Sequence, residues 1–294
     1  MKEITNLPAS VRGRLQNKAK ETGRPFAEVL QFYGMERFLY RLSHSRYAEN
    51  FILKGALMFT VWQVPQRRTT LDIDFLARCD NQIANIKKTI RDVCVESVPS
   101  DGLIFDPQTI RAESIREDAD YGGVRIKLIG FLERSRIPMQ IDIGFGEIVY
   151  PKPTVIDYPV ILDLPGPHLN GYPIESVVSE KFEAMVKLGV FNTRMKDFYD
   201  IWLMIRQFNF KGYDLSEALK GTFNHRKTSF PEHKPLFEQV FYEEKSDRQV
   251  LWKTFINNSE FNHVPEKLSI IVREIEGFLI RPLEIIKENQ EFRE

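Results

Sequence analysis

An alternation of apolar and acidic residues constrains the fold of this chain more than any other feature of its sequence. In the segment LDIDF, Asp72 and Asp74 fall together on one side of an extended chain. The other side carries the apolar side chains of Leu71, Ile73 and Phe75. A period of two is typical of a strand with one buried face, so the segment predicts a sheet with two carboxylates on its polar side.

A second alternation of the same kind occurs in IPMQIDIGFGEIVY, residues 137–150. Here Asp142 faces away from an apolar row formed by Ile137, Met139, Ile141, Ile143 and Phe145. The run GGVRIKLIGFLE, residues 122–133, also has strand character, and the tight polar connection predicts a hairpin. If the hairpin and LDIDF share a sheet, three acids converge on one side. The structural alternative is that Asp142 only pairs with Arg125 or Lys127.

Helical patterns dominate both ends of the chain. Apolar residues at spacings of three and four predict two helices within residues 8–46. Further helices are predicted at 82–98, 174–189, 193–208 and 214–224, between 234 and 257, and at the C-terminal end.

The Pro- and Gly-rich segment 151–173 is the best candidate for a domain boundary. We therefore expect an α+β fold in which a mixed sheet is flanked by helices. Its expected parts are a helical N-terminal arm (1–50), a core (51–165) and a mostly helical C-terminal domain that completes the active site (166–294).

Composition narrows the class of protein. The 294 residues contain 41 Lys plus Arg and 41 Asp plus Glu, so the net charge gives no general attraction to nucleic acid or anionic membrane. Two cysteines, Cys79 and Cys94, are too few for a disulfide framework. The N-terminus lacks a signal core, and no segment approaches the roughly 20 apolar residues of a membrane helix. We expect a cytoplasmic protein with no membrane partner.

The acidic pair suggests a divalent-metal site. Residues two apart in a strand lie roughly 7 Å apart on one face, so Arg68, Thr70, Asp72 and Asp74 form a polar row if the strand begins early enough. Carboxylate oxygens at this spacing suit Mg²⁺, with a nucleotide triphosphate completing the coordination. The alternative is an exposed strand face that simply carries charge.

Gly55, in the segment LKGAL, precedes an apolar run that predicts a strand-to-helix or helix-to-strand unit over residues 51–62. A glycine there allows the backbone to approach an anion closely, and the first N–H groups of a helix would point at that anion. A simple helix cap is the alternative.

Two helices of the C-terminal half place charges beside apolar stripes. In SEKFEAMVKLG, Lys181 lies at the edge of an apolar stripe, and in RMKDFYDIW the residues Arg194, Asp197 and Asp200 cluster beside another. Lys196 and Asp200 are four apart, so a surface ion pair is the default explanation.

Five parts of the chain occur in the order found in a known family. They are RFLYRLSHSRYAENFILKGALMF, RRTTLDIDF, YGGVRIKL with MQIDIGFGE, YPIESVVSEKFEAMVKLG and NTRMKDFYDIW. Together they resemble the AbiEii/AbiGii toxin-like nucleotidyltransferases, a branch of the polymerase-beta-like nucleotidyltransferase superfamily. The resemblance implies the nucleotidyltransferase fold.

The resemblance also implies roles for individual residues. Gly55 would belong to a phosphate-binding turn, Asp72 and Asp74 would bind metal, and Asp142 would be the third acid of the site. Lys181, in a KxxA pattern, would contact nucleotide phosphates, while Asp197 or Asp200 would support the active centre. The other candidate nucleotide-binding residues are Lys54, Ala56, Arg68, Thr70, Arg194 and Lys196. Thr70 is also a plausible modification target, although a β-former in a strand is an equal explanation.

One departure concerns the turn. Many superfamily members have two glycines and then Ser or Thr, whereas Ala56 and Leu57 follow Gly55 here. A side-chain hydroxyl contact to phosphate is therefore lost, while backbone N–H contacts survive.

The implied activity is Mg²⁺-dependent transfer of NMP from an NTP, with a second metal possible. Relatives are usually toxins of type IV toxin–antitoxin pairs in phage defence or growth arrest, and several modify the acceptor end of tRNA. We therefore expect a tRNA acceptor and an antitoxin encoded nearby. The phosphate-contacting clusters would be Lys187, Arg194 and Lys196, or Lys211, Lys220, Arg226 and Lys227. The alternatives are nucleotidylation of a protein and a non-catalytic module that binds a cation or a partner.

Overall fold

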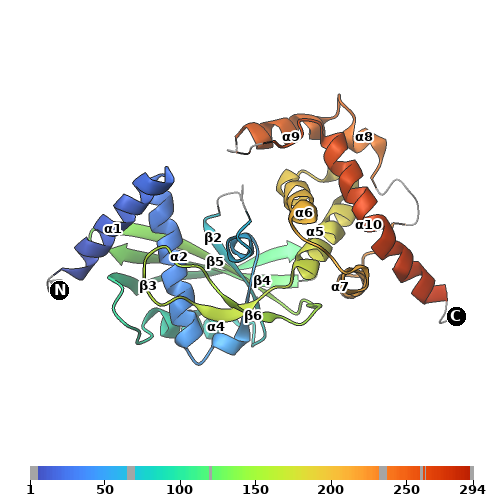
Figure 1. Cartoon of the computed structure of the whole chain (residues 1–294). Helices are drawn as coiled ribbons and strands as arrows, with labels where there is room; N and C mark the ends of the chain where they lie inside the picture. The colour runs from blue at the N-terminus through green and yellow to red at the C-terminus, as the bar shows by residue number, and fades with distance from the viewer. Residues whose placement is uncertain are drawn as a thin grey trace. The chain divides into compact units, whose positions relative to one another are not determined.

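A seven-stranded mixed sheet organises the N-terminal part of the chain in the computed structural model (Figure 1). The structure describes residues 6–64, 70–118, 121–231, 237–258, 261 and 263–291. The strand order is β3-β4-β5-β2-β1-β7-β6. The strands are β1 (Phe51–Lys54), β2 (Asp72–Ala77), β3 (Leu103–Asp118), β4 (Tyr121–Leu132), β5 (Ser135–Phe145), β6 (Thr154–Asp157) and β7 (His168–Gly171).

Two of the six strand pairs are parallel. β2 runs parallel to β5 and β1 runs parallel to β7, whereas the other neighbours are antiparallel. A mixed sheet with helices at both ends of the chain confirms the predicted α+β class. The predicted hairpin is also confirmed, since β4 and β5 pair from Leu132 and Ser135 onward.

Helix α2 (Phe26–His44) covers the apolar face of the sheet, and Figure 1 shows it running across the strands. Gly34 permits the contact, because a Cβ at this position would lie 2.9 Å from Ile137 Cγ2. Ile73, Phe75 and Ile141 are all fully buried. The alternation read from the sequence is therefore the division between a helix-covered face and a polar face.

The strand boundaries differ from the prediction at three places. β2 begins at Asp72, so Leu71 precedes the strand and is exposed rather than buried with Ile73. β3 is longer than the predicted GLIFDP, because β4 offers it a partner along its whole length. β6 and β7 were not predicted. Each has only four residues in a Pro- and Gly-rich segment. Pairing rather than an apolar period sets their position, since β7 pairs with β1 and β6 pairs with β7.

The remaining helices follow the predicted pattern. The segment after Gly55 is α3 (Leu57–Val61), so the expected unit runs from strand to helix. The others are α1 (Leu7–Thr22), α4 (Ile83–Cys94), α5 (Ile174–Leu188), α6 (Met195–Gln207), α7 (Gly212–His225), α8 (Gln239–Tyr242), α9 (Asp247–Asn257) and α10 (Leu268–Glu291).

Contacts divide the chain into two units, each with its own core. Unit 1 comprises Met1–Gln63, Thr69–Gly146 and Thr154–Gly171, and unit 2 comprises Val64–Arg68, Glu147–Pro153 and Tyr172–Glu294. The division into three domains at residues 50 and 165 stays a prediction. Within the described residues, no helix has the length and apolarity to cross a membrane. Cys79 and Cys94 are both free thiols.

Candidate active site

A row of charged residues crosses the polar face of the sheet in unit 1. Lys54 on β1 is in register with Asp74 on β2, and Asp74 is in register with Asp142 on β5. The row continues through Arg125 on β4 to Glu113 on β3. Residues in register on neighbouring strands share a face, so the predicted convergence of acids is present at the backbone level.

Asp72 lies one step along this face. Its register partner on β5 is Gln140, and it stands two residues before Asp74. Asp72 and Asp74 are both half-buried, whereas Ile73 between them is fully buried. The side chains of the acidic pair therefore line the polar face, as the alternation predicts.

The third acid is held by an arginine. Arg125 donates from Nε to Asp142 Oδ1 at 2.8 Å and from Nη2 to Asp142 Oδ2 at 2.7 Å. The hydrogen bond to Asp142 raises the pKa of Arg125, and the nearby charge of Asp72 raises it further. The ion pair that the sequence offered as the structural alternative is thus present. Lys127 pairs with Glu113 instead, at 3.0 Å.

Gly55 is in direct contact with the acidic strand. Its φ is 71°, and a Cβ added there would lie 2.0 Å from Asp74 Oδ2 and 2.7 Å from Asp74 Cγ. Only glycine combines this backbone conformation with this proximity. The Gly55 turn and the Asp74 carboxylate are therefore in direct contact. These are the expected phosphate-binding turn and one of the expected metal ligands.

The donor set of this face fits a hard cation. Asp72 and Asp74 supply carboxylate oxygens, which are the ligands that Mg²⁺ prefers. The space that a Cβ of residue 55 would fill is occupied by the Asp74 carboxylate itself. Among the described residues, no three acidic, His or Cys side chains already form a closed metal cage, and Asp142 engages Arg125 with both oxygens. Asp72 and Asp74 thus fit two of the ligand positions of a hard cation.

Thr70, a residue of the predicted polar row, lies before the strand. Thr70 precedes β2, is 8% exposed, and accepts a hydrogen bond from the backbone N–H of Asp72 at 3.4 Å. Its hydroxyl thus supports the start of the strand. Arg68 lies outside the described residues. The row on β2 therefore begins at Asp72.

A second charged cluster lies inside unit 2. Lys181 Nζ on α5 is 2.6 Å from Asp197 Oδ1 and 2.9 Å from Asp200 Oδ2, both on α6. Both carboxylates are 1% exposed. Burial opposes ionisation of Asp197, but Lys181 and then Arg194 outweigh it and hold its pKa below the ordinary value. The default explanation of a surface ion pair is therefore wrong for these acids.

The basic clusters expected to contact RNA differ in exposure. Lys187, Arg194 and Lys196 are exposed, although Arg194 also pairs with Asp197 at 2.8 Å. Arg226 is not a surface cation. It lies 2.6 Å from Glu147 and 2.8 Å from Glu183, and it holds α7 to α5. Sequence spacing alone gave no sign of these acidic neighbours.

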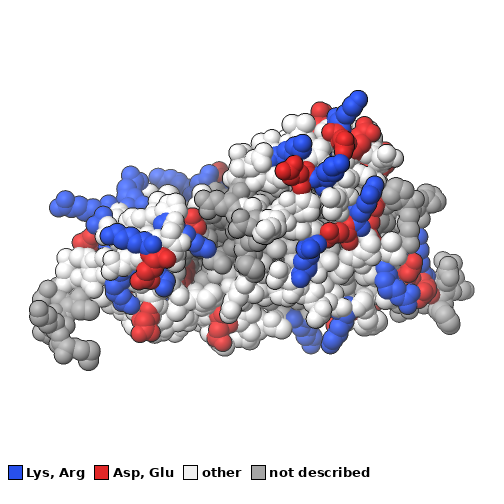
Figure 2. Space-filling view, turned by 45° about the horizontal axis from the view of Figure 1, so that its top comes forward, with Lys and Arg blue, Asp and Glu red and all other residues white. Residues whose placement is uncertain are grey.

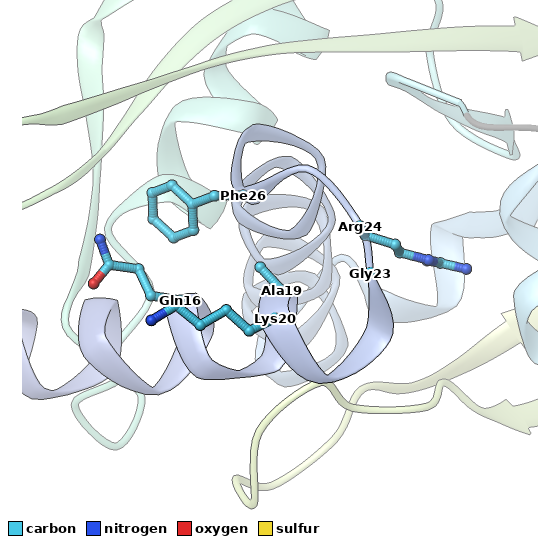
Figure 3. A pocket seen from close by; sticks show the side chains of 6 residues that line it. All are labelled: Gln16, Ala19, Lys20, Gly23, Arg24 and Phe26. Atoms are coloured by element: carbon cyan, nitrogen blue, oxygen red, sulfur yellow. The ribbon is translucent and has the colours of Figure 1, made fainter.

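A pocket of about 550 Å³ lies between α1 and α2, and no residue of the charged row lines it (Figure 3). It is lined by Gln16, Ala19, Lys20, Gly23, Arg24 and Phe26. None of these residues was predicted to take part in the site.

Comparison with known proteins decides the family. Residues 37–273 match the family described as the nucleotidyl transferase AbiEii toxin of a type IV toxin–antitoxin system. The chain belongs to the AbiEii family. The matched range contains the charged row of unit 1 and the Lys181 cluster of unit 2. The AbiEii protein described here is accordingly a nucleotidyltransferase, and the non-catalytic alternative is set aside.

Two solved structures resemble the AbiEii protein over most of its length. One is a candidate nucleotidyltransferase from H. pylori, with 14% identity, a TM-score of 0.48, and coverage of 90% of this chain and 96% of that chain. The other is JHP933 from Helicobacter pylori, with 15% identity, a TM-score of 0.44, and coverage of 90% and 97%. No curated protein matches the chain.

Proposed function

We propose that this AbiEii protein transfers NMP from an NTP to an RNA acceptor, the 3′ end of tRNA in the first place, with Mg²⁺ as cofactor. One observation carries the proposal. The Asp74 carboxylate fills the space where residue 55 would have a Cβ, so an anion held by the turn would lie beside the acids. Nucleotidyl transfer requires this neighbourhood of phosphate and carboxylates.

The residues of unit 1 have distinct roles in this proposal. Asp72 and Asp74 would hold Mg²⁺, which when bound neutralises charge on the triphosphate. The left-handed backbone of Gly55 lets the turn lie against Asp74. The N–H groups of Met58 and Phe59 already donate to the carbonyls of Gly55 and Ala56 at 3.2 Å, so the phosphate contacts would come from the N–H groups of the turn itself. Lys54, in register with Asp74, adds a cation beside the phosphates. Arg125 fixes the direction of the Asp142 carboxylate. Asp142 would bind a second metal or act as the base that activates the acceptor hydroxyl.

Lys181 is the proposed phosphate contact of unit 2. Its ammonium group lies between two buried carboxylates, which hold it in place. Asp197 and Asp200 would thus act through Lys181 rather than on the substrate. Arg194 and Lys196, at the start of α6, are further candidate nucleotide contacts.

The biological setting follows the family. We expect a cognate antitoxin encoded nearby, growth arrest or phage defence as the outcome, and action in the cytoplasm, where free thiols such as Cys79 and Cys94 stay reduced.

Incubation with α-labelled NTPs, Mg²⁺ and total RNA tests the proposal. We expect label in RNA of tRNA size, and its loss in the double variant Asp72→Ala plus Asp74→Ala. A control that removes two acids elsewhere in unit 1, Glu96→Ala plus Asp163→Ala, should retain activity. Label found only in protein would refute the RNA acceptor and favour protein nucleotidylation. Equal labelling of RNA by the double variant would refute the assigned acids.

A further inference from the structure

The segment 7–28 of the N-terminal arm carries an excess of positive charge in a chain that is neutral overall. It comprises α1, the turn at Gly23 and the start of α2, and it contains five cations and two acids. The cations are Arg12, Arg14, Lys18, Lys20 and Arg24, and the acids are Glu21 and Glu28. The segment precedes the range 37–273 that matches the family.

These cations face solvent. Arg14 and Lys20 are exposed, and the side chains of Arg12 and Lys18 are 42% and 44% exposed. Figure 2 shows Lys and Arg side chains gathered at the left of the view, on the side of the N-terminal helices. The hairpin tip between β4 and β5 extends this surface, since Glu133 lies 3.9 Å from Arg12 and is followed by the exposed Arg134.

The ion pairs within the arm leave part of the charge uncompensated. Lys18 pairs with Glu21 at 3.3 Å, and Arg24 pairs with Glu28 at 3.7 Å. Arg14 and Lys20 have no acidic partner within ion-pair distance among the residues that the structure describes. A polyanion on this surface would therefore not have to displace an existing partner of these two cations.

An aromatic ring stands beside the cations. Phe26, at the start of α2, is half-buried and lines the 550 Å³ pocket together with Gln16 and Lys20 (Figure 3). The Arg12 guanidinium lies 5.8 Å from the centre of the Phe26 ring. Aromatic rings beside cations are typical of surfaces that stack a base and hold its phosphates.

We infer that the N-terminal arm binds single-stranded RNA, with a base against Phe26 and phosphates on Arg14 and Lys20. An acidic polypeptide would also complement the positive charge of the arm. It has no base to stack on Phe26 or to contact the polar side chain of Gln16. The arm would thus hold the acceptor RNA independently of the charged row. The inference rests on the proposed function only in taking RNA as the acceptor.

Binding of a labelled single-stranded RNA of about 12 nucleotides, measured by fluorescence anisotropy without NTP, tests the inference. Arg14→Gln plus Lys20→Gln should weaken binding about tenfold and reduce the salt slope by roughly 1.4. The matched control on α4, Lys88→Gln plus Arg91→Gln, removes the same charge and should change little. Phe26→Leu should weaken binding about 5- to 150-fold because the ring is lost while the apolar bulk stays, and Phe26→Trp should restore binding.

The outcomes separate this inference from the proposed transfer activity. Loss of RNA binding in the arm variants supports the inference, whether or not RNA becomes labelled by NTP. Unchanged binding in the arm variants overturns it, even if Asp72→Ala plus Asp74→Ala abolishes transfer. Equal competition by poly-glutamate, with no effect of Phe26→Leu, also overturns it, because the surface would then take any acidic chain.

Discussion

Replacement of Gly55 by Ala should disrupt the turn and the acidic strand together. The φ of 71° costs an L-residue about 1 kcal/mol. The added methyl group would also lie 2.0 Å from Asp74 Oδ2 and 2.7 Å from Asp74 Cγ, which requires the carboxylate to move. Overpacking of this kind costs about 1–3 kcal/mol, so we expect Gly55→Ala to lower the free energy of unfolding by about 2–4 kcal/mol.

Gly23 provides the matched control for this change. Its φ of 69° is nearly the same, but nothing lies within 4 Å of the added Cβ. Gly23→Ala should therefore cost only the backbone part, about 1 kcal/mol. Urea denaturation followed by circular dichroism measures both changes, and transfer activity should be lost only for Gly55→Ala.

A double-mutant cycle identifies the cause. Asp74→Ala removes Oδ2 and Cγ but keeps the Cβ, which lies 2.8 Å from the added methyl group. Asp74→Gly removes all three atoms, so the effect of Gly55→Ala should fall to that of Gly23→Ala in this background. An effect of the same size in the parent and in the Asp74→Gly background would refute the reasoning, because backbone strain alone would then explain it.

Three further variants test the charged groups. Arg125→Gln should destabilise the protein by about 1.5–3 kcal/mol in urea denaturation, and the effect should vanish when Asp142→Asn is already present. Lys181→Met removes the cation that lies between two buried carboxylates, although Arg194 still pairs with Asp197, and should cost about 3 kcal/mol, whereas Lys187→Met, an exposed change on the same helix, should cost little. Burial raises the pKa of Glu36 to about 7, so its folded pKa exceeds its unfolded one. Stability should thus fall as pH rises from about 4.5 to 7, by at most about 1.4 kcal/mol per pH unit, and Glu36→Gln should remove this part of the slope in thermal melts. An equal slope in both proteins would contradict it.

Local patterns predicted most of the elements and the orientation of the acids. The alternation around Asp72 and Asp142 identified two strands and their polar faces, because side chains alternate strictly along a strand. Helices were predicted because their apolar residues recur at spacings of three and four, which places them on one face of the helix. β6 and β7 escaped prediction because four residues carry too little periodicity, and the pairing of β7 with β1, which joins them to the sheet, is not local.

The environment of each charge could not be predicted from spacing. Sequence distance did not reveal that Asp197 and Asp200 are buried around Lys181, since the two helices meet only in the folded unit. The same holds for Arg226, which spacing suggested as a phosphate contact but which lies among glutamates. Burial and ion pairing depend on what packs against a residue, and that is a property of the tertiary structure.

The sequence by itself determined which residues could form a site: two strands with acids on one face, a glycine before a helix, and two helices that carry a lysine and two aspartates beside apolar stripes. Only the tertiary structure decided the register that sets Lys54, Asp74, Asp142 and Arg125 in one row. It also placed the Asp74 carboxylate against Gly55. Periodicity is fixed by the geometry of each element, whereas register and contact depend on strand pairing between distant parts of the chain.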